Sequence, residues 1–95
     1  MDRNREPVEE KDILRAAIAK YGKQSQMLMV LEEMSELQKE ICKAFRGNDN
    51  AEEIADEVAD VEIMLDQLKI MFQIEPEVWN HRRFKLARLL KRLES

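Results

Sequence analysis

The chain has 95 residues, of which 44% are hydrophobic and 38% charged, with only two glycines and two prolines, as is typical of one small, mostly helical domain. Its net charge of −4 disfavours nucleic-acid binding, and the absence of a long apolar run excludes a membrane span. A domain this small buries little apolar surface, so we expect a homo-oligomer, a dimer or a tetramer.

The cysteine content and the first residues bear on cellular location. Cys42 is the only cysteine and falls within a helical pattern, so it forms no internal disulfide and suggests a reducing compartment. Residues 1–7 lack the apolar stretch of a signal peptide. We therefore expect a cytoplasmic protein in which residues 1–95 form a single domain with a flexible N-terminus at 1–7.

Helix signals divide the chain into segments that predict an all-α, four-helix-bundle-like fold. Gly22 ends the first segment, and Gly47 occupies the C′ position after the second. Asn50 is expected to cap the third helix, and Pro76 suits the first turn of the last one. The predicted helices span about 8–21, 23–45, 51–72 and 76–94.

Acidic side chains form two clusters inside the second and third helices. Their spacing of three or four residues stacks the side chains on one helix face, beside the apolar stripe. Like charges stacked in this way repel each other, which favours a nearby cation. The clusters contain Glu32, Glu33 and Glu36 in the second helix and Glu53, Asp56, Glu57 and Asp60 in the third.

Carboxylate ligands without His or Cys select hard cations, chiefly Mg²⁺, with Mn²⁺ as a substitute. Such a site neutralises a polyphosphate and lowers the pKa of a bound water. The one histidine, His81, lies outside the clusters, which argues against a di-iron site built from E-x-x-H motifs. The competing interpretation is that these glutamates form solvated helix faces, as Glu-rich helices commonly do.

The last predicted helix is basic, whereas the rest of the chain is acidic. Residues 76–95 carry six basic and two acidic side chains, or +4, so the net charge of −4 leaves −8 for the remainder. A basic helix can bind an anion beside a metal site. It can equally be a solvated face or pair with the acidic helices.

Two stretches carry a family resemblance: Q-M-L-M-V-L-E-E-M-S-E-L at 26–37 and E-V-A-D-V-E-I-M-L at 57–65. They resemble the MazG-like branch of the all-α nucleoside triphosphate pyrophosphohydrolases, in particular its short single-domain members. The family motif, E-E-x-x-E followed after a loop by E-x-x-D, matches Glu32, Glu33, Glu36, Glu57 and Asp60. The resemblance extends over roughly residues 21–93.

The resemblance implies a helical oligomer that uses Mg²⁺ to cleave a (d)NTP into a (d)NMP and pyrophosphate, in nucleotide-pool control or housecleaning. One carboxylate, Glu32 or Glu36, would orient or deprotonate the attacking water. Gln26 would face the nucleotide. The metal ligands would be Glu33, Glu36, Glu57 and Asp60, and the substrate phosphates would contact Lys85, Arg88 and Arg92.

Two alternatives stay open on the sequence. Glu53-x-x-Asp56 overlaps Glu57-x-x-Asp60; we prefer the later pair, because the residues after it match the family, and keep Glu53 as a further candidate ligand on the same helix face. The second alternative is functional: a non-catalytic helical module whose acidic and basic stripes mediate oligomerisation or protein interaction.

Overall fold

The computed structural model describes residues 9–95, which form four α-helices and no β-strand. The all-α prediction is therefore confirmed. The predicted start of the first helix at Val8 and the predicted flexible segment 1–7 lie outside the described residues. The helices are α1 (Glu10–Tyr21), α2 (Lys23–Phe45), α3 (Ala51–Phe72) and α4 (Glu75–Leu93).

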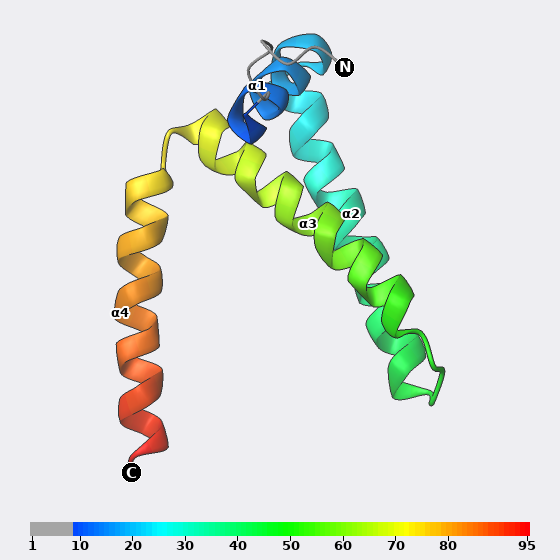
Figure 1. Cartoon of the computed structure of the whole chain (residues 1–95), viewed down its shortest axis with the longest axis vertical. Helices are drawn as coiled ribbons and strands as arrows, with labels where there is room; N and C mark the ends of the chain where they lie inside the picture. The colour runs from blue at the N-terminus through cyan, green and yellow to red at the C-terminus, as the bar shows by residue number, and fades with distance from the viewer. Residues whose placement is uncertain (1–8) are drawn as a thin grey trace, which may run out of the picture.

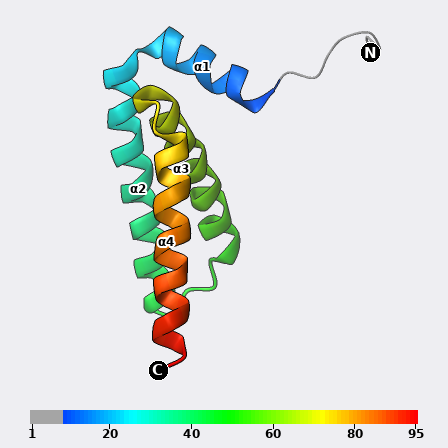
Figure 2. The same ribbon diagram turned by 90° about the vertical axis from the view of Figure 1, so that its left-hand side faces the viewer.

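Helices α2 and α3 form an antiparallel hairpin, and α1 crosses the end of the hairpin opposite the α2–α3 loop (Figures 1 and 2). Val30 of α2 and Met64 of α3 are the most deeply buried apolar side chains, at 4% and 6% exposed. They come from the apolar stripes that follow the three-and-four spacing of each helix. This hairpin carries the acidic clusters on its two paired helices.

Glycine at positive φ ends both α1 and α2, as the sequence predicts. Gly22 has φ 91° and Gly47 has φ 92°, positive values that residues with a Cβ rarely adopt and glycine adopts readily. At the end of α2, the Gly47 amide donates to the Ala44 carbonyl and the Asn48 amide to the Lys43 carbonyl. These two bonds form a Schellman motif, which satisfies carbonyls at the end of the helix.

Asn50 occupies the N-cap position of α3, but its side chain makes no capping hydrogen bond. The predicted side-chain cap is therefore wrong. The Asn50 side chain turns towards α2 instead, where its amide donates to the carbonyl oxygen and to Oε1 of Glu40, both at 2.9 Å. The α2–α3 loop is thus bonded to the helix that precedes it.

Helix α4 leaves the end of α3 and extends away from the hairpin (Figure 1). The turn between them contains Gln73 at φ 54°, and Pro76 lies in the first turn of α4 as predicted. Near this joint, Lys11 Nζ lies 3.1 Å from Glu75 Oε2. Beyond the first turn, α4 exposes its large apolar side chains: Trp79, Phe84, Leu86, Leu89, Leu90 and Leu93.

The single chain is more extended than a compact domain of its length. Its radius of gyration is 17.2 Å, whereas about 12 Å is expected for a compact 95-residue domain. Within residues 9–95, no helix is both long enough and apolar enough to cross a bilayer. The exposed large apolar side chains lie on helices that also carry many charged residues.

Candidate metal centre between α2 and α3

Three carboxylates from the two helices of the hairpin converge on one point. Glu33 of α2 and Glu57 and Asp60 of α3 each offer an oxygen, and these oxygens lie within 4.8 Å of one another. All three side chains are half-buried. Glu57 and Asp60 are three residues apart, so one helix face presents both of them to Glu33. Oxygens this close can bind a single cation together.

Within residues 9–95, the negative charges of this carboxylate cluster (Glu33, Glu57 and Asp60) are not balanced by an ion pair. Burial, followed by the charges of Asp60 and Glu57, raises the pKa of Glu33. Burial also raises the pKa of Glu57, followed by the charges of Asp60 and Asp56. A nearby cation would oppose both shifts. None of the ion pairs formed within residues 9–95 supplies one to these three carboxylates.

One oxygen of the cluster lacks a hydrogen-bond partner among residues 9–95. This oxygen, Glu57 Oε2, is buried, and no donor of the described residues reaches it. An unpartnered carboxylate oxygen is costly to bury, and a metal ion satisfies it without any hydrogen. With only carboxylate donors, the cluster fits Mg²⁺ or Mn²⁺ better than a softer metal.

The other predicted ligands lie at the margin of the cluster. Glu36 is exposed and its Oε1 lies 3.3 Å from Lys39 Nζ, although its charge contributes to raising the pKa values of Glu33 and Glu57. Glu32 and Glu53 are exposed. Of the two overlapping E-x-x-D pairs, the later one, Glu57 and Asp60, joins Glu33. The cluster therefore brings together three of the four predicted metal ligands.

Gln26 lies in the interface between α2 and α3. It is 7% exposed, and its Nε2 donates to Gln67 Oε1 at 2.8 Å. Gln67 is 4% exposed and was missed by the sequence reasoning. The sequence feature that could have revealed Gln67 is its position as a polar residue inside the apolar stripe of α3, between Met64 and Leu68. The contact of Gln26 with a nucleotide stays a prediction.

The pair formed by Glu40 and Asn50 was missed as well. The hydrogen bond from Asn50, followed by that from Lys43, lowers the pKa of Glu40. The Lys43 Nζ lies 3.0 Å from Glu40 Oε2. Glu40 follows Glu33 and Glu36 along one helix face, but its carboxylate is already occupied by these two donors. Glu40 is therefore a charged residue with a structural role, bonded to Asn50 and Lys43.

The predicted phosphate contacts all lie on α4. At about 100° per residue, Lys85, Arg88 and Arg92 share one face, within about 60° of one another. All three are exposed, and none forms an ion pair within the described chain. Within residues 9–95, α4 contacts α3 over a few residues and α1 through the Lys11–Glu75 ion pair, both near its start. The single chain therefore does not bring this basic face to the carboxylate cluster.

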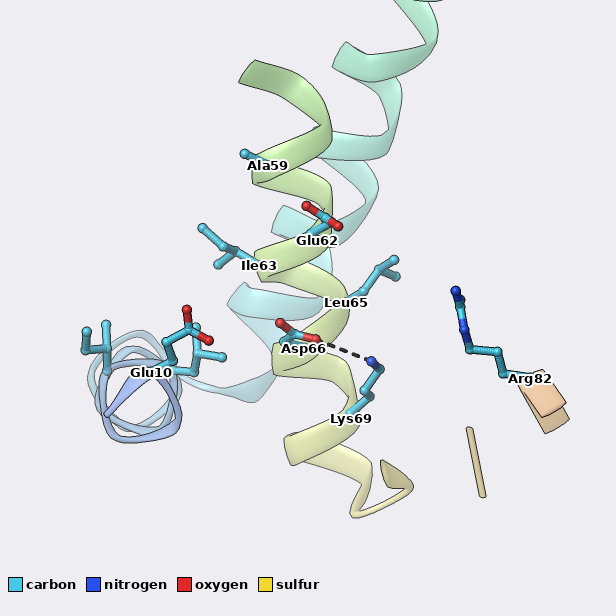
Figure 3. A pocket seen from close by; sticks show the side chains of 10 residues that line it. Glu10, Ala59, Glu62, Ile63, Leu65, Asp66, Lys69 and Arg82 are labelled. Carbon is cyan, nitrogen blue, oxygen red and sulfur yellow. Dashed lines mark hydrogen bonds and ion pairs between the residues drawn. The ribbon is translucent and has the colours of Figure 1, made fainter. Parts of the chain in front are cut away.

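A separate cavity of about 660 Å³ lies among α1, α3 and α4 (Figure 3). Its lining combines apolar side chains, including Ile63 and Leu65, with the ion pair between Asp66 and Lys69 at 3.3 Å. Arg82 borders it from α4. None of the three clustered carboxylates lines this cavity, so it is separate from the candidate metal centre.

No protein-family model, curated protein or solved structure matches this chain. The function of this chain is therefore inferred from the residues of the site.

Proposed function

We propose that this protein is a Mg²⁺-dependent nucleoside triphosphate pyrophosphohydrolase of MazG-like type, which cleaves a (d)NTP into a (d)NMP and pyrophosphate for nucleotide-pool control or housecleaning. The observation that carries the proposal is the convergence of Glu33, Glu57 and Asp60, which lie at the motif positions of the resemblance. The raised pKa values and the unpartnered Glu57 oxygen support a cation there.

Glu33, Glu57 and Asp60 would hold Mg²⁺, with Glu36 as a further ligand from the margin. Bound there, Mg²⁺ supplies positive charge to the phosphate oxygens and makes water a stronger nucleophile near neutral pH. Glu36 or Glu32, both exposed beside the cluster on α2, would orient the attacking water and accept its proton at a carboxylate oxygen. The water oxygen forms the new bond to phosphorus as the α–β phosphoanhydride bond breaks.

The basic face of α4 would act in an assembly. Lys85, Arg88 and Arg92 do not reach the cluster of their own chain, so we propose that oligomerisation brings them to the phosphates of the substrate. The apolar side chains exposed on α4 and the extended single chain support a dimer or tetramer. In that assembly, α4 would complete a bundle that α1, α2 and α3 leave open.

The direct test follows pyrophosphate release from a panel of dNTPs with Mg²⁺. We expect activity in the parent and a loss of at least about 100-fold in Asp60→Asn, because one anionic ligand is removed. Glu36→Gln is also expected to lose activity. Glu62→Gln, an exposed α3 carboxylate outside the cluster, is the matched control and keeps parental activity. Full activity in Asp60→Asn and Glu36→Gln, or none in the parent, would rule out the assignment.

The alternative is a non-catalytic oligomerisation module, which the exposed apolar side chains of α4 would also suit. The two functions differ in their response to metal. A ligand at 100 times its Kd stabilises the native state by about 2.7 kcal/mol. The pyrophosphohydrolase therefore predicts a Tm that rises with Mg²⁺ in the parent and much less in Asp60→Asn. The module predicts the same Tm with and without Mg²⁺.

A further inference from the structure

Asn50 joins the α2–α3 loop to Glu40, which lies five residues before the end of α2. It is 8% exposed, and its side-chain amide donates twice to Glu40, once to the carbonyl oxygen and once to Oε1. Its own carbonyl accepts the first hydrogen bond of α3, from the amide of Ile54 at 3.0 Å. Asn50 therefore links the start of α3 to a fixed position on α2.

Two of the clustered carboxylates, Glu33 and Glu57, lie the same number of residues from this link. Glu33 comes seven residues before Glu40 on α2, and Glu57 comes seven residues after Asn50 on α3. Seven residues are close to two helical turns, or about 10.5 Å along each axis, and return to nearly the same face. In an antiparallel pair, two turns along each helix from Glu40 and Asn50 place Glu33 opposite Glu57.

A second polar contact lies on the other side of the cluster. Gln26 precedes Glu33 by seven residues, so Gln26, Glu33 and Glu40 follow one line along α2. Gln26 bonds to Gln67 in the interface, where both side chains are buried. Polar residues buried at such positions fix the register of paired helices, because a shift leaves them without partners.

We infer that the Asn50–Glu40 link, together with the Gln26–Gln67 contact, sets the register of α3 against α2 and so positions Glu33 and Glu57 to bind one cation. A slip of one turn moves α3 by about 5.4 Å, which is more than the 4.8 Å within which the three oxygens lie. Asn50 is thus a positioning residue that acts through Glu40. The cation part of this inference rests on the proposed function; the register part does not.

The register is tested without metal, by the distance between spin labels on cysteines that replace Gln24 and Glu52. Both positions are exposed, and Cys42→Ser removes the native thiol. The two sites are offset by about 21 Å along the hairpin axis, so a slip of one turn changes the distance by about 4 Å. Labelled chain is diluted with unlabelled chain, so that each measured pair lies within one molecule.

We expect one narrow distance distribution in the parent and in Asn48→Ala, whose exposed side chain makes no hydrogen bond within the described residues. Asn50→Ala is expected to broaden the distribution and add a population displaced by about 4 Å. The same narrow distribution in Asn50→Ala as in the parent would overturn the inference, whatever the protein does with metals.

If Asn50→Ala loses its helical circular dichroism signal, variants that alter the charge at positions 40 and 50 test the Asn50–Glu40 link instead. Glu40→Gln keeps an amide oxygen for Asn50 and is expected to keep the register. Asn50→Asp sets two carboxylates against each other and should lose it. Adding Glu40→Gln to Asn50→Asp restores a donor and should narrow the distribution again. A distance distribution in the double variant as broad as that of Asn50→Asp alone would contradict the Asn50–Glu40 link.

The positioning of the carboxylates is tested by Mn²⁺ titration, with free Mn²⁺ measured by electron paramagnetic resonance. We expect about a ten-fold weaker affinity in Asn50→Ala, within the range for residues that orient ligands, and parental affinity in Asn48→Ala. Equal affinities in the parent and Asn50→Ala would overturn the positioning role. A parent that binds no Mn²⁺ would remove the proposed function, while the label distances would still decide the register.

Discussion

Three glutamates of the hairpin differ in pKa because their neighbours differ. Glu40 has an amide and an ammonium group as partners, and its pKa is lowered, first by the hydrogen bond from Asn50. Glu33 and Glu57 are half-buried and face other carboxylates, so their pKa values are raised, first by burial. The carboxylate cluster therefore binds protons more tightly than the unfolded chain does, and a metal ion would displace those protons.

This difference predicts how stability depends on pH in EDTA. Between the ordinary pKa of 4.5 and the raised value, the folded state binds more protons than the unfolded state, so stability falls as pH rises. Glu57→Gln removes the charge and the repulsion. We expect Glu57→Gln to have a higher Tm than the parent at pH 7 and a smaller decrease in Tm between pH 5 and 7.

The dependence of Tm on pH is measured by thermal unfolding, followed by circular dichroism at several pH values in EDTA. Glu62→Gln provides the control, because that side chain is exposed on the same helix and lies outside the cluster. Its pH profile should follow that of the parent. A parent whose Tm is unchanged or increases from pH 5 to 7 would be inconsistent with repulsion at the cluster.

At the scale of helices, local signals predicted most of the structure. Glycine at positions that require positive φ, and the three-and-four spacing of apolar residues, gave helix ends close to those observed. The carboxylates at motif spacing gave Glu33, Glu57 and Asp60. The helix ends and the spacing within each acidic cluster depend on residues near each other along the chain, so a sequence can reveal them. That Glu33 joins Glu57 and Asp60 depends on the pairing of two helices and was expected from the family resemblance alone.

The partners of Asn50 and Gln26 could not be predicted in the same way. Asn50 is a good local cap, but a carboxylate ten residues away in sequence takes its side chain. Gln26 pairs with Gln67, 41 residues away. Both contacts depend on the register of α2 against α3. The orientation of α4 likewise depends on packing between helices and was not predictable from local pattern.

The joint between α3 and α4 gives a prediction at this scale. Gln73 adopts φ 54° and ψ 46°, the left-handed region, which costs a residue with a Cβ about 1–2 kcal/mol. Glycine avoids that cost but loses about 0.5–1 kcal/mol more in chain entropy. We therefore expect Gln73→Gly to raise the free energy of unfolding by about 0.5–1 kcal/mol in urea denaturation.

Gln73→Ala is the matched control, since alanine also carries a Cβ and should not stabilise the protein. Neither variant touches the carboxylate cluster, so the Mg²⁺-dependent change in Tm should be the same in both. A Gln73→Gly variant that is less stable than Gln73→Ala would contradict the predicted relief of backbone strain at this joint.

At the scale of the whole molecule, α4 has an apolar face and a basic face on opposite sides of the helix. Trp79, Leu86 and Leu90 lie along one face, within about 40° of one another, while Lys85 and Arg88 lie on the other side. The basic helix carries charge opposite to that of the acidic remainder of the chain. An apolar face that packs against a second copy would leave the basic face free for phosphates. This arrangement accounts for both the extended chain and its uneven charge.

The apolar face of α4 is tested by Leu86→Ser with Leu90→Ser. Each leucine is just over half exposed in the single chain, so burying the rest of it in an interface contributes about half of the 1.5–3 kcal/mol of a fully exposed leucine. Losing both weakens association by about 1.5–3 kcal/mol per copy, which is at least about 10-fold in Kd. Sedimentation velocity should therefore show a parental oligomer and a smaller species for the double variant.

His81→Ser, on the other side of α4, is the control and should sediment as the parent does. A monomeric parent, or a double variant with parental mass, would mean that this face does not hold copies together, and the basic helix would then need another route to the phosphates.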